Sequence, residues 1–282
     1  MSRSRNAPIT IMIEKVTNYL GYDFVQNALM AGTLAAILGA IVGYFVIVRN
    51  VGFAAHALSH IGFTGAAAAA LFGLNPLQGI LLLTIGAGFV LGVSGDKVQR
   101  SDMAIGMVLS ISLGLGTLFL SFYRGYAGQT MAILFGDIFG VSTEQLMEMV
   151  GLSLLSLGGL AIFSRRLLFA SIQPRLAEAR GLSLAALSIA FMVVLAISVS
   201  MASQVVGILL VFTLVIAPAG IALRLCLSFW RGIVTAVVLG VVVVWAGILL
   251  ACLTDRPPSF WITALFFVIY VAVESWCRFN VK

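Results

Sequence analysis

The stretch Asn27–Val48 reads NALMAGTLAAILGAIVGYFVIV and contains no charged residue over its 22 positions. A hydrocarbon core about 30 Å thick is crossed by about 20 apolar residues in an α-helix, so this stretch is long enough to span a membrane. The stretch therefore predicts a transmembrane helix.

Eight further runs of this kind follow along the chain. They lie at residues 57–74, 76–95, 103–123, 146–163, 182–200, 204–223, 232–252 and 259–277. The only carboxylates in all nine runs are those of Glu148 and Glu274, and each lies within about a turn of a run's end, from where it can reach the interface. We therefore predict an all-α fold, a polytopic transmembrane helix bundle of about nine spans, within a range of eight to ten.

Two segments do not fit this pattern. Met131–Val141 is apolar but too short to span a membrane, and it contains Asp137, so we expect a re-entrant or interfacial piece. Residues 1–26 form an N-terminal segment whose short apolar patch is interrupted by Glu14 and Lys15. We expect this segment to be interfacial and not a cleaved signal peptide. The transmembrane domain then covers residues 27–282 and leaves no room for a second, soluble domain.

The composition excludes several classes of protein. Of the 282 residues, 61% are hydrophobic and 9% are charged, whereas soluble domains average about 45–50% and about 25%. The net charge of +6 comes from basic residues scattered between the apolar runs, which is atypical of nucleic-acid binding and typical of topology signals. Eleven of the 16 Lys and Arg residues lie on the inner side if the N-terminus is outside, so we predict that orientation. The three cysteines are far apart, which argues against a disulfide framework or a metal cluster.

The chain has only two histidines, His56 and His60, in the stretch HALSHIGFTG at residues 56–65. A separation of four places both imidazoles on one helical face, and this spacing can bind a divalent cation. Two interpretations stay open at this point, contact with an ion or a pair of packing histidines. The stretch lacks the Glu of an H-E-x-x-H zinc-protease motif, so it does not support hydrolysis.

The loop Ser164–Gly181 is punctuated like a short helix lying parallel to the membrane. Pro174 suits the first turn, because its missing N–H is not needed there, and Gly181 provides a stop. Leu176, Ala177 and Arg180 are then expected on one side of a two-turn rod, where they could dock a partner or simply belong to a linker.

Pro218 lies about two thirds of the way along the apolar run Gln204–Arg224. Proline removes a backbone hydrogen bond, so we expect a kink or a break in the helix there. No lysine of the chain stands in a G-x-x-x-x-G-K-[ST] phosphate loop, so the chain does not hydrolyse ATP itself.

Five segments together resemble one family. They are HALSHIGFTG (56–65), SDMAIGMVLSISLGLG (101–116), LFGDIFGVS (134–142), IQPRLAEARGLS (172–183) and VVGILLVFTLVIAPAGIALR (205–224). In order and at matching spacing they resemble the permease family of the zinc-, manganese- and iron-uptake ABC transporters, from about residue 27 to the end of the chain.

The resemblance implies a multi-pass permease of the bacterial cytoplasmic (inner) membrane. It implies two permease subunits, two cytoplasmic ATP-binding subunits and an extracytoplasmic metal-binding protein, with lipid but no nucleic acid as a further partner. The cargo would be zinc, manganese or iron, and no cofactor would be bound permanently. His60 matches the family's motif histidine in the ion path. In the segment near residues 171–181, Pro174, Ala177 and Gly181 match the coupling helix that docks on the ATPase, and Arg175 and Glu178 are the further residues expected at that contact.

The chain departs from the family pattern at two places. His56 stands where the family commonly has Asp, and imidazole suits zinc or a similar transition metal better than calcium-like ions. Gln173 and Arg175 stand where an acidic pair is common, which affects the charges expected at the ATPase contact.

Three alternatives remain. An ABC importer permease for a chelate such as a siderophore or cobalamin would also be a helical bundle with a coupling helix. A secondary transporter usually carries intramembrane carboxylates, and only Glu148 and Glu274 come close. An intramembrane enzyme would need paired acids, a Ser/His arrangement or H-E-x-x-H, and the sequence contains none of these.

Overall fold

The computed structural model describes residues 18–99, 101–123, 136–208, 210–225 and 228–280, and within these ranges every regular element is a helix. The helices are α2 (Asp23–Arg49), α3 (Gly52–Phe72), α4 (Pro76–Gln99), α5 (Asp102–Phe122), the 3₁₀ turn η1 (Ile138–Gly140), α7 (Thr143–Ile172), α8 (Pro174–Ala179), α9 (Leu184–Val206), α10 (Val211–Arg224), α11 (Phe229–Thr254) and α12 (Pro258–Asn280). The predicted all-α bundle is confirmed. The expected interfacial segment lies outside the described residues up to position 17.

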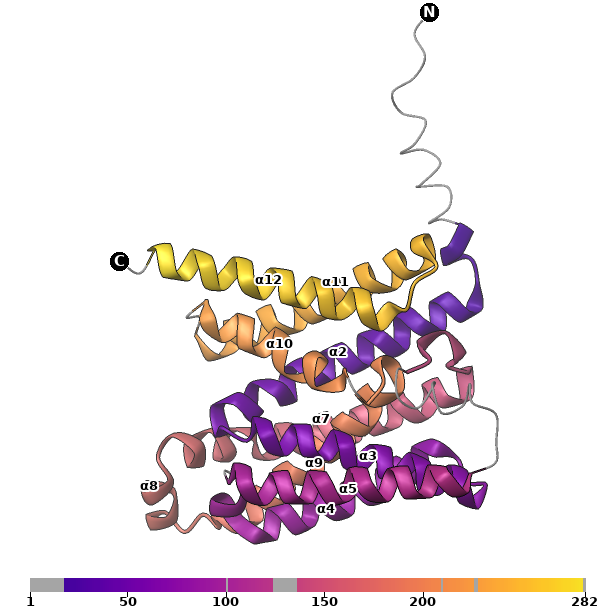
Figure 1. The fold of residues 1–282 in the computed structure, drawn as a ribbon. Helices are drawn as coiled ribbons and strands as arrows, with labels where there is room; N and C mark the ends of the chain where they lie inside the picture. Colours follow the sequence, from indigo (N-terminus) through magenta and orange to yellow (C-terminus); the bar gives the residue numbers. More distant parts are fainter. Residues whose placement is uncertain (1–17, 100, 124–135, 209, 226–227, 281–282) are drawn as a thin grey trace, which may run out of the picture.

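Eight of these helices are long and apolar enough to cross a membrane. The ninth predicted span is not one helix, because α9 takes in Gln204–Val206 and α10 is only 14 residues long. The chain breaks at Gly207, whose φ of 82° is a left-handed conformation that glycine adopts without strain. Gly207 and Ile208 are buried in protein, where irregular backbone is tolerated at membrane depth. The chain starts α2 and ends α12 at opposite ends of the bundle (Figure 1), so the broken segment completes an odd number of crossings.

Three helices form the centre of the bundle. About two thirds or more of the residues in the apolar windows of α2, α3 and α9 are buried, against 11% for α12 and 17% for α5. In Figure 1, α2 crosses the middle of the molecule, with α10, α11 and α12 on one side and α3, α4, α5 and α9 on the other. The outer helices therefore offer their faces to lipid or to partner chains, and the central three carry the features analysed below.

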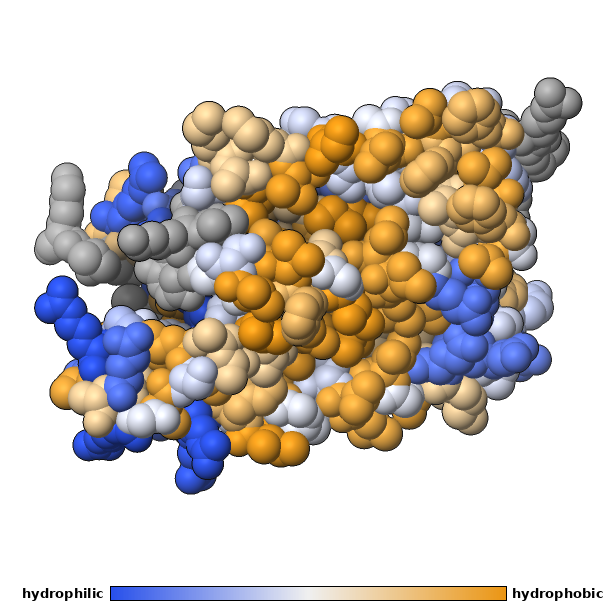
Figure 2. Space-filling view, turned by 90° about the horizontal axis from the view of Figure 1, so that it is seen from below, coloured by the Kyte–Doolittle hydropathy of each residue, from blue (hydrophilic) through white to orange (hydrophobic). Residues whose placement is uncertain are grey.

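The surface has the polarity that a membrane imposes. Figure 2 shows a hydrophobic band across the middle of one face and hydrophilic residues gathered at the two ends. Large exposed apolar side chains in α4 and α5 include those of Leu82, Phe89, Met107 and Ile111. We call the end that carries α8, the α2–α3 corner and the last turn of α12 the α8 end (Figure 1).

The short apolar stretch Met131–Val141 is described only from residue 136. Its described part forms η1, in which the carboxylate of Asp137 accepts a hydrogen bond from Gly140 N at 3.0 Å. The side chain of Asn27, near the start of α2, donates to Val141 O at 3.3 Å. This part of the stretch therefore lies against α2 at the end of the bundle opposite to α8.

Small residues and hydroxyl groups hold the helices together. Gly65 of α3 and Gly79 of α4 lie so close that a Cβ on either would collide with the other's backbone. The hydroxyl of Thr84 in α4 lies 2.7 Å from that of Ser200 in α9, and both are fully buried. In lipid no hydrophobic force drives helix association, so close approach and hydrogen bonds such as these carry it.

We predict that Gly65→Ala destabilises the protein, because the added methyl group must push α3 away from α4. Overpacking of this kind costs about 1–3 kcal/mol. The expected result is a lower midpoint in thermal unfolding of the detergent-solubilised protein. Gly86→Ala is the matched control, since a Cβ at Gly86 meets open space. Equal midpoints for both variants would contradict the close α3–α4 contact.

Candidate functional site

The two histidines lie in the first turns of α3, near the α8 end. A short corner places them there. Asn50 adopts a left-handed conformation with φ 57°, its N–H and that of Val51 bond to carbonyls of α2, and α3 starts at Gly52. At a rise of about 1.5 Å per residue, His56 and His60 then stand about 6 and 12 Å along α3. Their shared helical face, which the sequence predicts, is present in the structure.

The two imidazoles face each other through the same ring atom. His56 Nε2 and His60 Nε2 are 3.3 Å apart, and the ring centroids are 4.6 Å apart with the planes almost perpendicular. His60 is 9% exposed, and His56 is half-buried. A single ring N–H can bridge this pair, or a cation can take its place.

The other ring nitrogen of each histidine lacks a partner. Nδ1 of His56 and Nδ1 of His60 are buried, and neither has a hydrogen bond within the described part of the chain. If one Nε2–H bridges the pair, the other imidazole must carry its proton on Nδ1, where it stays unsatisfied. A half-satisfied buried polar pair is unfavourable. This arrangement favours ion contact over a pair of histidines kept for packing.

Two aromatic rings contact His56. The ring of Phe212, from α10, meets it edge to face with centroids 5.1 Å apart, and the ring of Phe53 stacks on it at 6.2 Å. Ser112 of α5 lies behind His60, with its Oγ 3.5 Å from the backbone oxygen of His60. The sequence gives no sign of the Phe212 contact, because α3 and α10 are far apart in the chain.

The pair has the geometry of two ligands of one ion. With Zn–N bonds of about 2.0–2.1 Å, two nitrogens 3.3 Å apart would subtend about 104–111° at the ion, close to the tetrahedral angle. Among the described residues, no group of three or more His, Cys, Asp or Glu side chains could hold a metal. An ion at the pair would therefore keep open positions for water among the described residues.

The second candidate site, the α8 segment, differs from its predicted shape. The sequence predicts a loop from Ser164, but α7 continues to Ile172, because no helix breaker precedes Pro174 and the buried Leu167 and Ala170 anchor the extension. Only Pro174–Ala179 forms a separate helix, which starts with Pro174 in its first turn. Gly181, with φ 76°, follows its end as expected.

The predicted docking residues do not share one environment. Pro174, Arg175, Glu178 and Gly181 are exposed, whereas Ala177 is fully buried in the core. Leu182 N donates to Ala177 O at 3.0 Å. Ala177 thus holds α8 against the bundle, whereas its neighbours Leu176 and Arg180, expected on the same side of the rod, have different surroundings. Leu176 is exposed, and the guanidinium of Arg180 lies over the ring of Phe169.

Pro218 does not interrupt its helix. Helix α10 is continuous through the buried Pro218, so the helix is not broken there, and the described break lies instead at Gly207 and Ile208. The ring of Pro218 leaves the carbonyl of Leu214 without its helical donor. This carbonyl faces Gly39 of α2, where an added Cβ would lie 3.3 Å from Leu214 O. The proline therefore belongs to a close α2–α10 contact.

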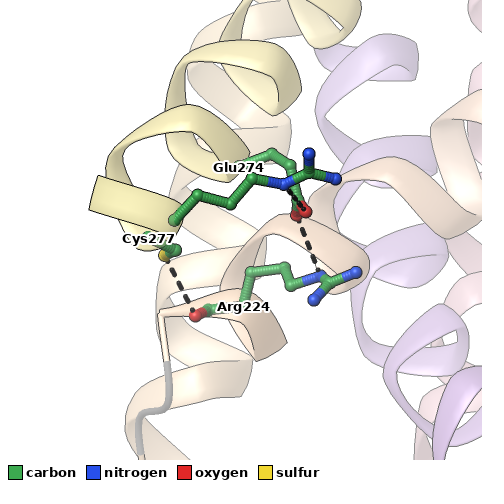
Figure 3. A network of polar contacts seen from close by, with 4 residues as sticks. Arg224, Glu274 and Cys277 are labelled. Carbon is green, nitrogen blue, oxygen red and sulfur yellow. Dashed lines mark hydrogen bonds and ion pairs between the residues drawn. The ribbon is translucent and has the colours of Figure 1, made fainter. Parts of the chain in front are cut away.

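A polar network ties α12 to α10 at the α8 end (Figure 3). Glu274 forms ion pairs with Arg224 at 3.3 Å and with Arg278 at 3.1 Å, and Cys277 Sγ lies 3.5 Å from Arg224 O. The carboxylate of Glu274, which was expected to reach the interface, pairs here with two exposed arginines and joins α12 to α10.

Comparisons with known proteins identify the family of this chain. Residues 21–277 match the sequence profile described as the ABC 3 transport family. The chain is 30% identical over 222 residues to the "Manganese transport system membrane protein MntC" of Listeria monocytogenes, covering 78% of this chain and 79% of the relative. It is 24% identical to the "High-affinity zinc uptake system membrane protein ZnuB" of Haemophilus influenzae, covering 83% of this chain and 90% of the relative.

Two solved structures share the fold. PsaBC from Streptococcus pneumoniae in complex with Fab has a TM-score of 0.82 at 25% identity and covers 93% of this chain and 95% of that one. An inward-facing metal-chelate type ABC transporter has a TM-score of 0.65 at 15% identity, covering 96% and 97%, and shows the fold alone.

We predict that Ala177→Arg detaches α8 from the bundle, because a guanidinium cannot occupy the buried position of a methyl group. Hydrogen exchange followed by mass spectrometry should show faster exchange over residues 174–183. Glu178→Arg, next to it but exposed, is the control and should exchange like the wild type. Unchanged exchange in Ala177→Arg would contradict the buried placement of Ala177.

Proposed function

Since this chain belongs to the ABC 3 transport family, we propose that it is the permease subunit of an importer that carries a divalent transition-metal ion into the cytoplasm. The relatives named for manganese and for zinc support a metal cargo. The proposal covers zinc, manganese and iron, and the chain itself has no ATP-binding motif. Its place is the bacterial cytoplasmic membrane, where the nine crossings would form one half of a homodimeric pathway.

The observation that carries the proposal is the close approach of the two imidazoles of α3. Their Nε2 atoms lie 3.3 Å apart, and their Nδ1 atoms are buried without hydrogen bonds in the described structure. Only neutral imidazole binds a metal, so an ion held here would be released when the pair is protonated. His56 and His60 are therefore the proposed ion contacts of the path.

The energy comes from a partner in this proposal. A cytoplasmic ATP-binding subunit docks on the exposed side of α8, which offers Arg175, Leu176 and Glu178. An extracytoplasmic metal-binding protein delivers the ion at the opposite end. The two ATP-binding subunits close on each other when they bind ATP, and α8 moves with them. The path then opens toward the loaded binding protein. The histidines then hold the ion weakly enough to let it leave.

The proposal is tested by metal content. Metal-limited cells that lack the gene are complemented with the wild type or with His60→Ala, and total zinc, manganese and iron are measured by mass spectrometry. We expect one metal to fall on deletion and to return only with the wild type. Loss of a ligand should slow uptake by about tenfold or more.

Ser59→Ala is the matched control, since Ser59 is buried beside His60 and its hydroxyl bonds to Ala55 O of its own helix. It should restore the metal as the wild type does. If His60→Ala restores the metal at the wild-type rate, the ligand role is wrong. If deletion changes no metal, the free-ion cargo is wrong and a metal chelate becomes the leading candidate.

A further inference from the structure

Arg49 is a cation buried at the joint between two central helices. It is the last residue of α2 and only 7% exposed. A charged side chain inside a membrane protein is costly unless it has partners, and it commonly marks a functional element. Its position at the C-terminal end of α2 offsets part of this cost through the helix dipole.

Two contacts of its guanidinium lead to α9. Arg49 Nη2 donates to Ser188 Oγ at 3.3 Å, and the guanidinium carbon lies 5.3 Å from the centre of the Phe191 ring. Ser188 and Phe191 are three residues apart and so lie on one face of α9. Phe191 also approaches Phe45 of α2, with ring centroids 6.4 Å apart. The hydrogen bond and the cation–π contact together fix the guanidinium in position and orientation.

The segment that connects α8 to this contact is short and held by hydrogen bonds. Leu182 N bonds to Ala177 O, and the hydroxyl of Ser183 caps α9 by accepting from Ala186 N at 3.2 Å. Ser188 follows about one turn into α9. A displacement of α8 can therefore be passed to Ser188 and Phe191 through this short connection and the capped first turn of α9.

On the other side, Arg49 is joined to the histidine helix. Asn50 N and Val51 N bond to the carbonyls of Ile47 and Val46, and Ala55 N bonds to Val51 O. These three hydrogen bonds join the end of α2 to the first turn of α3, and His56 follows directly after Ala55. A shift of the guanidinium acts on the first turn of α3, where the proposed ion ligands begin.

We propose that Arg49 is a positioning residue that links α9 to α3, so that movement of α8 changes the placement of His56 and His60. This inference rests on the proposed function, because it assigns to α8 the movement imposed by the ATPase. It adds the connection between the two sites. Arg49 touches neither the ion nor the ATPase, and it sets how much transport each ATP hydrolysis produces.

The test measures coupling in the complete transporter, reconstituted in vesicles with its ATPase and loaded binding protein. Zinc, manganese and iron uptake and ATP hydrolysis are followed in the same sample. For Arg49→Met, which keeps an unbranched apolar stem but removes the guanidinium, we expect ATP hydrolysis within about twofold of the wild type. The number of ATP molecules hydrolysed per ion should rise by roughly fivefold or more. A merely structural role lowers both activities together and leaves this ratio unchanged.

Partner variants keep the test valid if Arg49→Met does not assemble. Arg49→Lys retains the charge but loses the flat ring contact, and Phe191→Leu removes the same contact from the other side. Each should raise the number of ATP molecules hydrolysed per ion. The variant that combines Arg49→Lys with Phe191→Leu should raise it no further than the stronger of the two alone, because both changes act on one contact. Arg231→Met changes an exposed arginine in the first turn of α11 and should leave the number of ATP molecules hydrolysed per ion unchanged.

The outcomes are distinct. An unchanged ratio in Arg49→Met, Arg49→Lys and Phe191→Leu overturns the positioning role and leaves the proposed function standing. Absence of any metal uptake by the wild-type vesicles overturns the proposed function and this inference with it. A raised ratio in Arg231→Met as well would show a general effect of basic residues at the α8 end, and it also overturns the specific role of Arg49.

Discussion

A backbone N–H or C=O without a hydrogen-bond partner is too costly in hydrocarbon, and the architecture of this chain follows from that constraint. It requires each crossing to be helical. The break between α9 and α10 occurs where Gly207 and Ile208 are buried in protein. Even there backbone groups find hydrogen-bond partners within the chain, since Leu210 N and Val211 N both bond to Gly207 O. Association of the helices then depends on close approach, as at Gly65 and Gly79, and on buried hydroxyl pairs.

Within such an apolar bundle, each buried polar group has to be explained by its position. The hydroxyl pairs join neighbouring helices. The two imidazoles face each other with two ring nitrogens unsatisfied in the described structure, and the guanidinium of Arg49 contacts α9 at the joint of α2 and α3. The proposed ion contacts and the proposed link to α8 therefore lie within about two turns of one corner. The corner connects the ATPase side of the bundle to the ion path in this account.

Much of the fold could be predicted from the sequence, because each span is a local pattern of apolar residues. The ends of the spans were harder to predict. The sequence shows the polar Ser164–Arg166 as the start of a loop, yet α7 continues, since its register keeps Leu167 and Ala170 buried. Pro218 suggested the break that lies at Gly207, because a proline can be accommodated where the freed carbonyl meets a neighbouring glycine.

The site could be predicted only in part, for a related reason. A spacing of four residues fixes the shared face of His56 and His60, so their pairing was predictable. The contacts of Phe212 with His56 and of Arg49 with Ser188 join elements far apart in the chain, and no local pattern reveals them. The burial of Ala177 likewise depends on how α8 packs against the bundle.

The central claim is that His56 and His60 bind the transported ion through their Nε2 atoms. X-ray absorption at the zinc edge, on the purified transporter loaded with one equivalent of zinc, tests it most directly. The account predicts two imidazole nitrogens at about 2.0–2.1 Å, and their loss when His56→Leu and His60→Leu are combined. A spectrum without imidazole ligands, or one that the double variant leaves unchanged, would contradict it.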